Sequence, residues 1–441
     1  MRVLCLSNGH GEDIIAVRIL QQLQQQSHSL ELAALPLVGD GRAYAELDIP
    51  IIGPVQTMPS GGFIYMDGRQ LVRDVQGGLL QLTLAQHRAI RKWASPGRPK
   101  ERGRGVILAV GDIVPLLFGW LSGVPYAFVG TAKSEYYLRD EAGPLPRRDQ
   151  RGRWEGWSGS VYLPWERWLM SRRRCKAVFP RDGLTTQMLQ KWSIPAFDLG
   201  NPMMDGLEPP RSRAIFYSSN TEQEEMRRSL IVALLPGSRP PEAYANWQQI
   251  MQACVGLMQG FAPRPVLFLG AIALGLNLDP LRQTLIAQDW RESNAPGESE
   301  KFSPSPISDP EALTFTKENG TLILTQHAYN DCLNQADLAI AMAGTATEQF
   351  VGLGKPAIAI PGEGPQFTSA FAEAQSRLLG PSLILVEQPA KVAGVVQYLL
   401  RDPDRLQLIA ENGRRRMGEA GSAERIAACV MERLLGFYFS I

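Results

Sequence analysis

Residues 337–348 read Asp-Leu-Ala-Ile-Ala-Met-Ala-Gly-Thr-Ala-Thr-Glu, an apolar run that breaks at one glycine and continues in helix-forming residues. The apolar run predicts a buried strand. Gly344 allows the backbone to approach a ligand closely, because glycine has no side chain to keep the two apart. The stretch therefore predicts a strand, a tight turn and a helix start, as in parallel α/β sheets.

The same turn has the chemistry of an anion site. The backbone N–H groups of Thr345, Ala346 and Thr347, together with the two hydroxyls, lie at a helix N-terminus, where negative charge is stabilised. Glu348, one turn into the helix, can accept hydrogen bonds from two neighbouring ribose hydroxyls. An ordinary capped helix is an equal alternative, with Thr345 as the cap and Glu348 completing a capping box.

Outward from this stretch, apolar runs of strand length alternate with amphipathic segments of helix length, which is typical of a parallel sheet covered on both faces. We predict an α/β fold with two Rossmann-like, doubly wound parallel-sheet domains facing a cleft. The expected strands lie near 2–7, 31–38, 106–110, 125–129 and 176–179, and then near 230–235, 265–270, 321–325, 337–342, 356–360 and 382–386.

The polar stretch 208–228 predicts a linker between the two domains, which we place at 1–207 and 229–418. A final helix over 419–441 could pack back on the N-terminal domain. Two insertions interrupt the alternation. Residues 291–318 are rich in Ser, Pro and Glu and predict a mobile loop.

The second insertion, 131–174, combines aromatic residues with many arginines. It fits a membrane-interface patch, a wall for an acceptor substrate, or a helical excursion packed on the domain. A glycine-flanked apolar segment, 61–66, could dip into lipid or form a core hairpin. The aromatic residues of the insertion are Tyr136, Tyr137, Trp154, Trp157, Tyr162, Trp165 and Trp168.

Two more turns at strand ends suit a nucleotide. Gly237, Ser238 and Arg239 follow the strand near 230–235, and an arginine fork there matches the oxygens of a diphosphate. Residues 361–367 form a turn rich in glycine and proline, in which Gln366 can hydrogen-bond to a sugar or ribose.

The first strand is followed by Ser7-Asn8-Gly9-His10-Gly11-Glu12-Asp13, and we expect a helix from about Ile14. We interpret His10, Glu12 and Asp13 as groups that orient or deprotonate an acceptor hydroxyl, with helix capping by the acidic residues as the alternative. Asp112 follows the strand near 106–110 and is our first candidate for the general base.

Bulk composition excludes several classes of protein. The five cysteines have no CxxC spacing and the four histidines no metal-ligand spacing, so we expect neither disulfides nor a metal. The N-terminus enters a strand directly, and we expect a cytoplasmic protein, peripheral on a membrane at most. Net charge is +1, but Lys and Arg exceed Asp and Glu in the first half, which suits an anionic membrane; no nucleic-acid-binding motif accompanies them.

Taken together, the Pro236–Arg239 turn, the Gly344–Glu348 helix start and the 361–367 loop resemble the donor lobe of two-lobed glycosyltransferases of the GT-B fold. The nearest family is lipid-A-disaccharide synthase, with its "PGSR" and "SGTATLE"-type segments. Residues 200–205 are similar to its "GHP" stretch, with Asn201 in place of His. The N-terminal "GExSGD" motif is matched only loosely by residues 9–13, and Val110-Gly111-Asp112 stands where that family has an aspartate-rich segment.

The resemblance implies a glycosyltransferase that moves a hexose or N-acetylhexosamine from a UDP-sugar to a lipid or lipid-linked acceptor without a metal or other cofactor. It implies that Gly237, Ser238, Arg239, Thr345 and Thr347 meet the diphosphate and Glu348 the ribose. A UDP-sugar 2-epimerase of the same fold is the competing enzyme class. A degenerate transferase that only binds sugar nucleotides or lipids is the non-enzymatic alternative.

Overall fold

A computed structural model describes residues 1–56, 79–95, 105–146, 157–207, 229–293, 307–362, 364 and 367–436 of the chain. Its contacts divide the chain into two units, which we describe separately. Unit 1 comprises Met1–Asp205 together with Gly418–Ile441, and unit 2 comprises Gly206–Met417. The expected linker, 208–228, and the apolar segment 61–66 lie outside the described residues.

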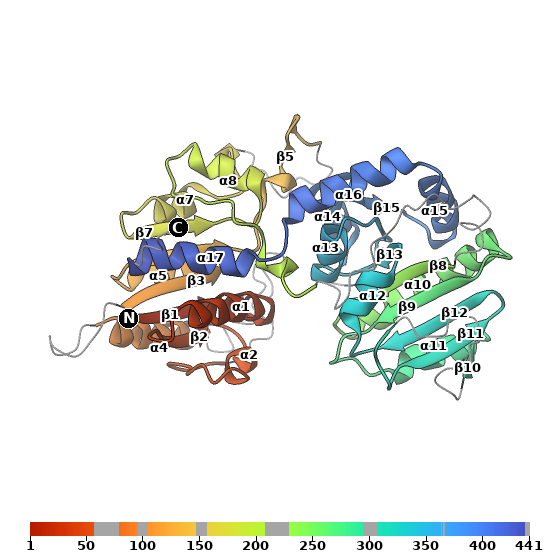
Figure 1. The fold of residues 1–441 in the computed structure, drawn as a ribbon, viewed down its shortest axis with the longest axis horizontal. Coiled ribbons are helices and arrows are strands. Elements are labelled where there is room, and N and C mark those ends of the chain that lie inside the picture. The colour runs from red at the N-terminus through yellow and green to blue at the C-terminus, as the bar shows by residue number, and fades with distance from the viewer. Residues whose placement is uncertain are drawn as a thin grey trace. The chain divides into compact units, whose positions relative to one another are not determined.

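Unit 1 is built on a five-stranded sheet in which all neighbouring strands are parallel, in the order β2-β1-β3-β4-β7. Strand β1 has neighbours on both sides, and the chain changes direction across the sheet between β1 and β3 (Figure 1). The strands are β1 (Arg2–Ser7), β2 (Glu31–Pro36), β3 (Gly105–Gly111), β4 (Tyr126–Gly130) and β7 (Cys175–Phe179).

Helices cover both faces of this sheet, because its central strands are apolar on both sides. Val3 and Cys5 face a core that includes α1 and α17, whereas Leu4 and Leu6 face a core with α4, α5, α7 and α8. The helices of unit 1 are α1 (His10–Gln26), α2 (Arg42–Ala45), α4 (Leu79–Ala94), α5 (Ile113–Leu121), α7 (Pro164–Met170), α8 (Gly183–Gln190) and α17 (Ser422–Val430).

The C-terminal helix α17 belongs to unit 1 although unit 2 separates it from the rest of that unit in the sequence. Ile426, Ala427 and Val430 are fully buried in the same core as Ile19 and Leu23 of α1. Figure 1 shows α17, in blue, beside α1, in red. The last helix therefore completes one apolar layer of the N-terminal sheet.

Unit 2 has an eight-stranded sheet in the order β10-β11-β12-β9-β8-β13-β14-β15. The six strands from β12 to β15 run parallel, and the chain changes direction across the sheet between β8 and β13. The strands are β8 (Leu230–Leu235), β9 (Val266–Ala271), β10 (Arg291–Ser293), β11 (Leu313–Lys317), β12 (Gly320–Thr325), β13 (Leu338–Ala341), β14 (Ala357–Ala359) and β15 (Leu383–Leu385).

The expectation of a loop over 291–318 is wrong in part. β10 and β11 pair in antiparallel fashion at the edge of the sheet, and β11 pairs likewise with β12. The buried Phe315 of β11 faces the core, and this one aromatic anchor among polar neighbours explains how a stretch with little hydrophobic signal becomes a strand. Residues 294–306, in the middle of the insertion, lie outside the described residues.

Helices connect the strands of unit 2, as the alternation predicts. The longest, α10, buries Trp247 and Ile250 completely. No helix in the described part of the chain is long and apolar enough to cross a bilayer. The helices are α10 (Glu242–Phe261), α11 (Asp279–Ala287), α12 (Tyr329–Gln335), α13 (Thr345–Gly352), α14 (Ser369–Leu379), α15 (Val392–Leu400) and α16 (Pro403–Met417).

Candidate functional site

The three glycine-containing turns of unit 2 gather at one edge of its sheet. β8, β13 and β14 are neighbours and run parallel, so their carboxyl ends lie at the same edge. Pro236–Arg239 follows β8, Met342–Gly344 follows β13, and residues 360–367 follow β14. The first two turns flank the point where the chain changes direction, which is where open α/β sheets bind ligands.

Asn246 of α10 holds the first two turns together. Its buried side chain donates to the carbonyl oxygen of Pro236 at 3.0 Å and to that of Met342 at 3.4 Å. A Cβ atom on Gly362 would lie only 2.9 Å from the Asn246 Oδ1 atom, so the third turn also packs against this side chain. One residue that sequence reasoning did not single out therefore sets the spacing of all three turns.

Glu242, at the start of α10, fixes the third turn. Its carboxylate accepts from the backbone N–H of Phe367 at 2.6 Å and would clash with any side chain at position 364. Gln366, expected to meet a sugar or ribose, lies outside the described residues, as do positions 363 and 365.

The N-terminus of α13 has no side-chain cap. The helix begins at Thr345, and its N-cap is Gly344, so the alternative in which Thr345 caps and Glu348 completes a capping box is wrong. The first helical bond runs from the Glu348 N–H to the Gly344 carbonyl oxygen, at 3.2 Å. Thr345 is exposed and Ala346 half-buried, which leaves this helix end accessible to an anion.

The other residues predicted to bind the donor differ in how accessible their polar atoms are. The hydroxyl of the fully buried Thr347 donates to the Ala343 carbonyl oxygen at 2.6 Å, so the expectation that this hydroxyl meets a phosphate is wrong. Glu348 is 8% exposed, whereas Ser238 and Arg239 are exposed. Gly237 has a φ of +101°, a conformation that favours glycine and turns the chain toward α10.

In unit 1, two of the three predicted catalytic residues meet at the edge where β1 and β3 end. A Cβ atom on Gly111 would lie 3.2 Å from Cβ of Asn8 and 3.4 Å from Cγ of Glu12, so the Glu12 stem packs on the end of β3. Asp112 is the next residue in the chain. The helix α1 begins at His10 rather than near Ile14, which places Glu12 in its first turn; of His10 only the backbone belongs to the described part.

The pKa values of the Glu12 and Asp112 carboxyl groups are both raised above their ordinary values. Burial raises the pKa of Glu12, and the negative charge of Asp112 raises it further, while the Thr131 hydroxyl donates to Glu12 at 3.3 Å. Burial also raises the pKa of Asp112, whose carboxylate caps α5 by accepting from the Val114 N–H at 2.9 Å. A pKa raised toward neutrality is suited to general acid–base chemistry.

Asp13 has a structural position instead. It is 2% exposed and accepts from the Ser7 hydroxyl at 2.5 Å, and Ser7 in turn accepts from the Tyr44 hydroxyl at 2.6 Å. Burial raises the pKa of Asp13 to about 7. The chain of three side chains joins β1, α1 and α2 beneath the predicted catalytic edge.

We expect the Asp13→Asn variant to change how stability depends on pH. A carboxyl group whose pKa rises from 3.8 to about 7 on folding stabilises the fold most below pH 3.8, and this contribution is lost as pH rises to 7. The wild-type protein should therefore lose up to about 4 kcal/mol relative to the variant between pH 4 and pH 8. Urea denaturation at both pH values measures this difference, and an equal difference at the two would contradict the assignment.

A buried ion pair lies beside the Asp112 edge. Lys133 and Glu166 are 6% and 2% exposed, and their charged atoms are 2.5 Å apart. Glu166 also accepts from the Leu163 N–H at 2.8 Å. The positive charge of Lys133 and the negative charge of Glu166 act in opposite directions on the pKa of Asp112. No sequence signal links two residues 33 positions apart, and sequence reasoning missed both.

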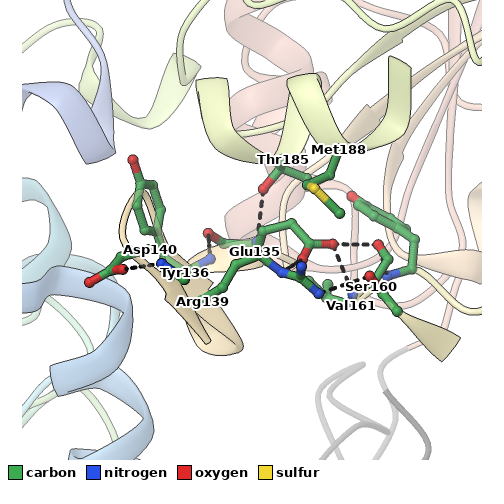
Figure 2. Close-up of polar contacts among 12 residues, drawn as sticks. Glu135, Tyr136, Arg139, Asp140, Ser160, Val161, Thr185 and Met188 are labelled. Atoms are coloured by element: carbon green, nitrogen blue, oxygen red, sulfur yellow. Dashed lines mark hydrogen bonds and ion pairs between the residues drawn. The ribbon is translucent and has the colours of Figure 1, made fainter. Parts of the chain in front are cut away.

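A second buried carboxylate anchors the described part of the 131–174 insertion. Figure 2 shows Glu135 at the centre of contacts with Ser160, Val161 and Arg139. It is fully buried, accepts from the Val161 N–H at 3.0 Å and lies 3.0 Å from the Arg139 guanidinium. Tyr136 and Tyr162 are buried with it, so this half of the insertion packs on the unit.

Comparison with known proteins identifies the fold. No profile of a known protein family matches the chain, and no curated protein matches its sequence. Its structure is similar to that of UDP-GlcNAc 2-epimerase from Neisseria meningitidis bound to UDP-GlcNAc (TM-score 0.53, 12% identity, 98% of this chain and 100% of that one).

Two glycosyltransferase structures are similar to the same extent. They are MurG of Acinetobacter baumannii (TM-score 0.50, 12% identity, 98% and 99% coverage) and the calicheamicin glycosyltransferase CalG4 (TM-score 0.54, 14% identity, 97% and 98% coverage). At these identities the likeness concerns the fold alone. The chain has two Rossmann-like parallel-sheet domains, as the apolar runs predicted, and they are of the GT-B type, as the resemblance implied.

Proposed function

We propose that this chain is a glycosyltransferase that moves a hexose or N-acetylhexosamine from a UDP-sugar to a lipid or lipid-linked acceptor. The observation that carries the proposal is the gathering of three glycine turns at one edge of the unit 2 sheet, two of them at its switch point, beside an uncapped helix with Glu348 one turn in. An uncapped helix end is suited to a diphosphate and a carboxylate to ribose hydroxyls. That one similar structure holds UDP-GlcNAc supports a uridine nucleotide.

The proposed reaction divides the work between the units. In unit 1, Asp112 or Glu12 takes the proton from the acceptor hydroxyl. The hydroxyl oxygen then bonds to the anomeric carbon of the sugar, and the bond from that carbon to the diphosphate breaks. UDP departs with the electron pair, and in unit 2 the N–H groups of α13 and the Arg239 guanidinium offset its charge. We propose no metal or other cofactor for this step.

The paired carboxyl groups of unit 1 also support a second candidate, a UDP-sugar 2-epimerase. Burial raises the pKa of both groups, the charge of Asp112 raises that of Glu12 further, and one protonated and one ionised group can serve as acid and base on a single sugar. The two reactions differ in product, since a transferase releases UDP only when an acceptor is present and an epimerase forms the isomeric UDP-sugar without one. A binding protein without activity would bind UDP and yield neither product.

The first test is thermal unfolding with UDP, UDP-N-acetylglucosamine, UDP-glucose, NAD and ATP. We expect only the uridine nucleotides to raise the unfolding midpoint, because a ligand that binds the native state stabilises it by mass action. Glu348→Gln removes a charged hydrogen-bond acceptor and should weaken UDP binding by roughly 10- to 100-fold. Glu411→Gln, on the exposed face of α16, is the matched control and should bind UDP like the wild type.

Two results of this experiment would reject the proposed donor site. One is a chain that responds to no uridine nucleotide. The other is a Glu348→Gln variant whose UDP affinity equals that of the control.

A further inference from the structure

The exposed tryptophans of the described chain gather in one stretch of unit 1. Trp157, Trp165, Trp168 and Trp192 are 77%, 53%, 43% and 38% exposed. The remaining described tryptophans are half-buried or, as in unit 2, almost fully buried. Tryptophan is highly buried on average, so four exposed indole rings within 36 consecutive positions indicate a surface that meets another partner. We call these four residues the tryptophan surface.

Close contacts and a shared helix connect the members of the tryptophan surface. Trp165 and Trp168 lie one turn apart on α7, and Trp168 lines an open hollow together with Arg167 and Trp192. The Arg167 guanidinium stacks 4.0 Å from the Trp192 ring and donates to the Ser158 carbonyl oxygen, next to Trp157. The indole rings therefore belong to one structured surface rather than to separate loops.

The helix α7, which carries two of these tryptophans, is packed on the core of unit 1. On the opposite side of α7, Leu169 and Met170 are buried in the core, and Glu166 is held by the buried Lys133. The exposed tryptophans therefore lie on the outer side of a helix whose inner side is already packed in the core. The helix presents one apolar side to the protein and a second one, rich in indole, to its surroundings.

The chain segment that carries three of the four tryptophans is basic. Within 157–176 the only acidic residue is Glu166, which is buried in its ion pair, whereas five residues are basic. The Arg172 guanidinium lies 4.3 Å from the Trp168 ring, and Arg173 and Lys176 are exposed. The five basic residues are Arg167, Arg172, Arg173, Arg174 and Lys176.

We propose that the tryptophan surface docks the chain on an anionic lipid bilayer. Indole rings favour the level of the lipid headgroups, where the ring is half in hydrocarbon and its N–H is in water. Arginines that stack on these rings can hold their charge at the lipid phosphates. Tryptophan and arginine are enriched at protein interfaces as well, but five basic residues beside one acidic residue that is already paired match the uniform negative charge of an anionic bilayer. This inference does not depend on the proposed reaction.

The test is sedimentation of the full chain with vesicles. We expect binding to vesicles of phosphatidylcholine with phosphatidylglycerol, weak binding to phosphatidylcholine alone, and release at high salt. Arg172→Gln with Arg173→Gln should weaken binding to the anionic vesicles by about 25-fold, or about fivefold for each charge. Trp157→Ala with Trp165→Ala should weaken it by roughly tenfold or more and should affect neutral lipid as well.

A matched control comes from unit 2, where the exposed Tyr398 lies 5.7 Å from the Arg405 guanidinium. Tyr398→Ala removes an aromatic ring beside an arginine from another surface and should leave vesicle binding unchanged. Circular dichroism and the thermal unfolding midpoint of each variant report whether the chain is folded, so that a loss of vesicle binding can be read independently of the proposed reaction.

Three results would overturn the inference. The first is a full chain that sediments with neither kind of vesicle, and the second is a tryptophan variant that binds like Tyr398→Ala. The third is self-association of the wild-type chain in light scattering that the tryptophan variant abolishes, because the surface would then meet a second copy of the chain.

Discussion

We expect the Asp112→Asn variant to release UDP in the presence of acceptor about 10²- to 10⁴-fold more slowly than the wild type, the range typical of a lost general base. UDP binding should not change, because we propose that unit 2 binds the uridine nucleotide. The fold should also persist, since asparagine caps a helix as well as aspartate does and can still accept from the Val114 N–H. Steady-state rates of UDP release measure the effect.

The pH profile distinguishes a base from a merely structural residue. The wild-type rate should rise with pH through the raised pKa of the base, because only the ionised carboxylate accepts a proton. If Glu12 is the base, Asp112→Asn removes a like charge, lowers the Glu12 pKa and moves the rising limb to lower pH with a modest loss of rate. Asp48→Asn is the matched control, at an exposed position with a φ of +54°, which asparagine also adopts.

The same measurements therefore identify which of the two carboxylates, Glu12 or Asp112, is the general base. Glu12→Gln should abolish activity if Glu12 is the base and reduce it only moderately if Asp112 is. Unchanged rates in both variants would exclude a catalytic role for this edge of unit 1.

The second large effect concerns stability. Lys133→Met should lower the free energy of unfolding of unit 1 by about 3–5 kcal/mol, because the Glu166 carboxylate would be left buried without its cation. Urea denaturation measures the loss. The double variant Lys133→Met/Glu166→Gln should recover most of it, since glutamine is uncharged and can still accept from the Leu163 N–H.

An exposed ion pair in the same unit serves as the control. Arg42 of α2 and Glu46, the residue that follows this helix, are 3.0 Å apart, with side chains 78% and 63% exposed. Arg42→Met should cost less than about 0.5 kcal/mol, as is usual for exposed pairs one helical turn apart. A Lys133→Met variant no less stable than Arg42→Met would show that burial of the Lys133–Glu166 pair carries no energetic weight.

The central strands were predictable because they are buried on both faces. Strands such as Val3–Leu6 and Leu338–Ala341 are continuous apolar runs, and every strand expected from such a run lies within two residues of its predicted bounds. The edge hairpin was not predictable from the same signal. β11 presents a single buried ring, Phe315, among polar residues, and it follows a stretch rich in serine and proline.

The candidate sites divide in the same manner. The turns after β8 and β13 were found from sequence because a glycine that follows an apolar run can be recognised from the local sequence alone. The residues that shape those turns were not found, since the contacts of Asn246 and Glu242 reach across 96 and 125 positions of the chain. The sequence also cannot show that the Thr347 hydroxyl is used by a carbonyl group inside the helix, because that depends on how deeply the helix is buried.

The packing of α17 on α1 has a consequence for how the protein is made. The ribosome releases the chain from the N-terminus onward, so the sheet of unit 1 emerges first and α17 last. Until Ile426 and Val430 arrive, the side of α1 that carries Ile19 and Leu23 has no cover. Unit 2 can fold during this interval, because its segments are contiguous. The first domain to be synthesised is therefore the last to be completed, and an unfinished nascent chain presents an exposed apolar surface to chaperones.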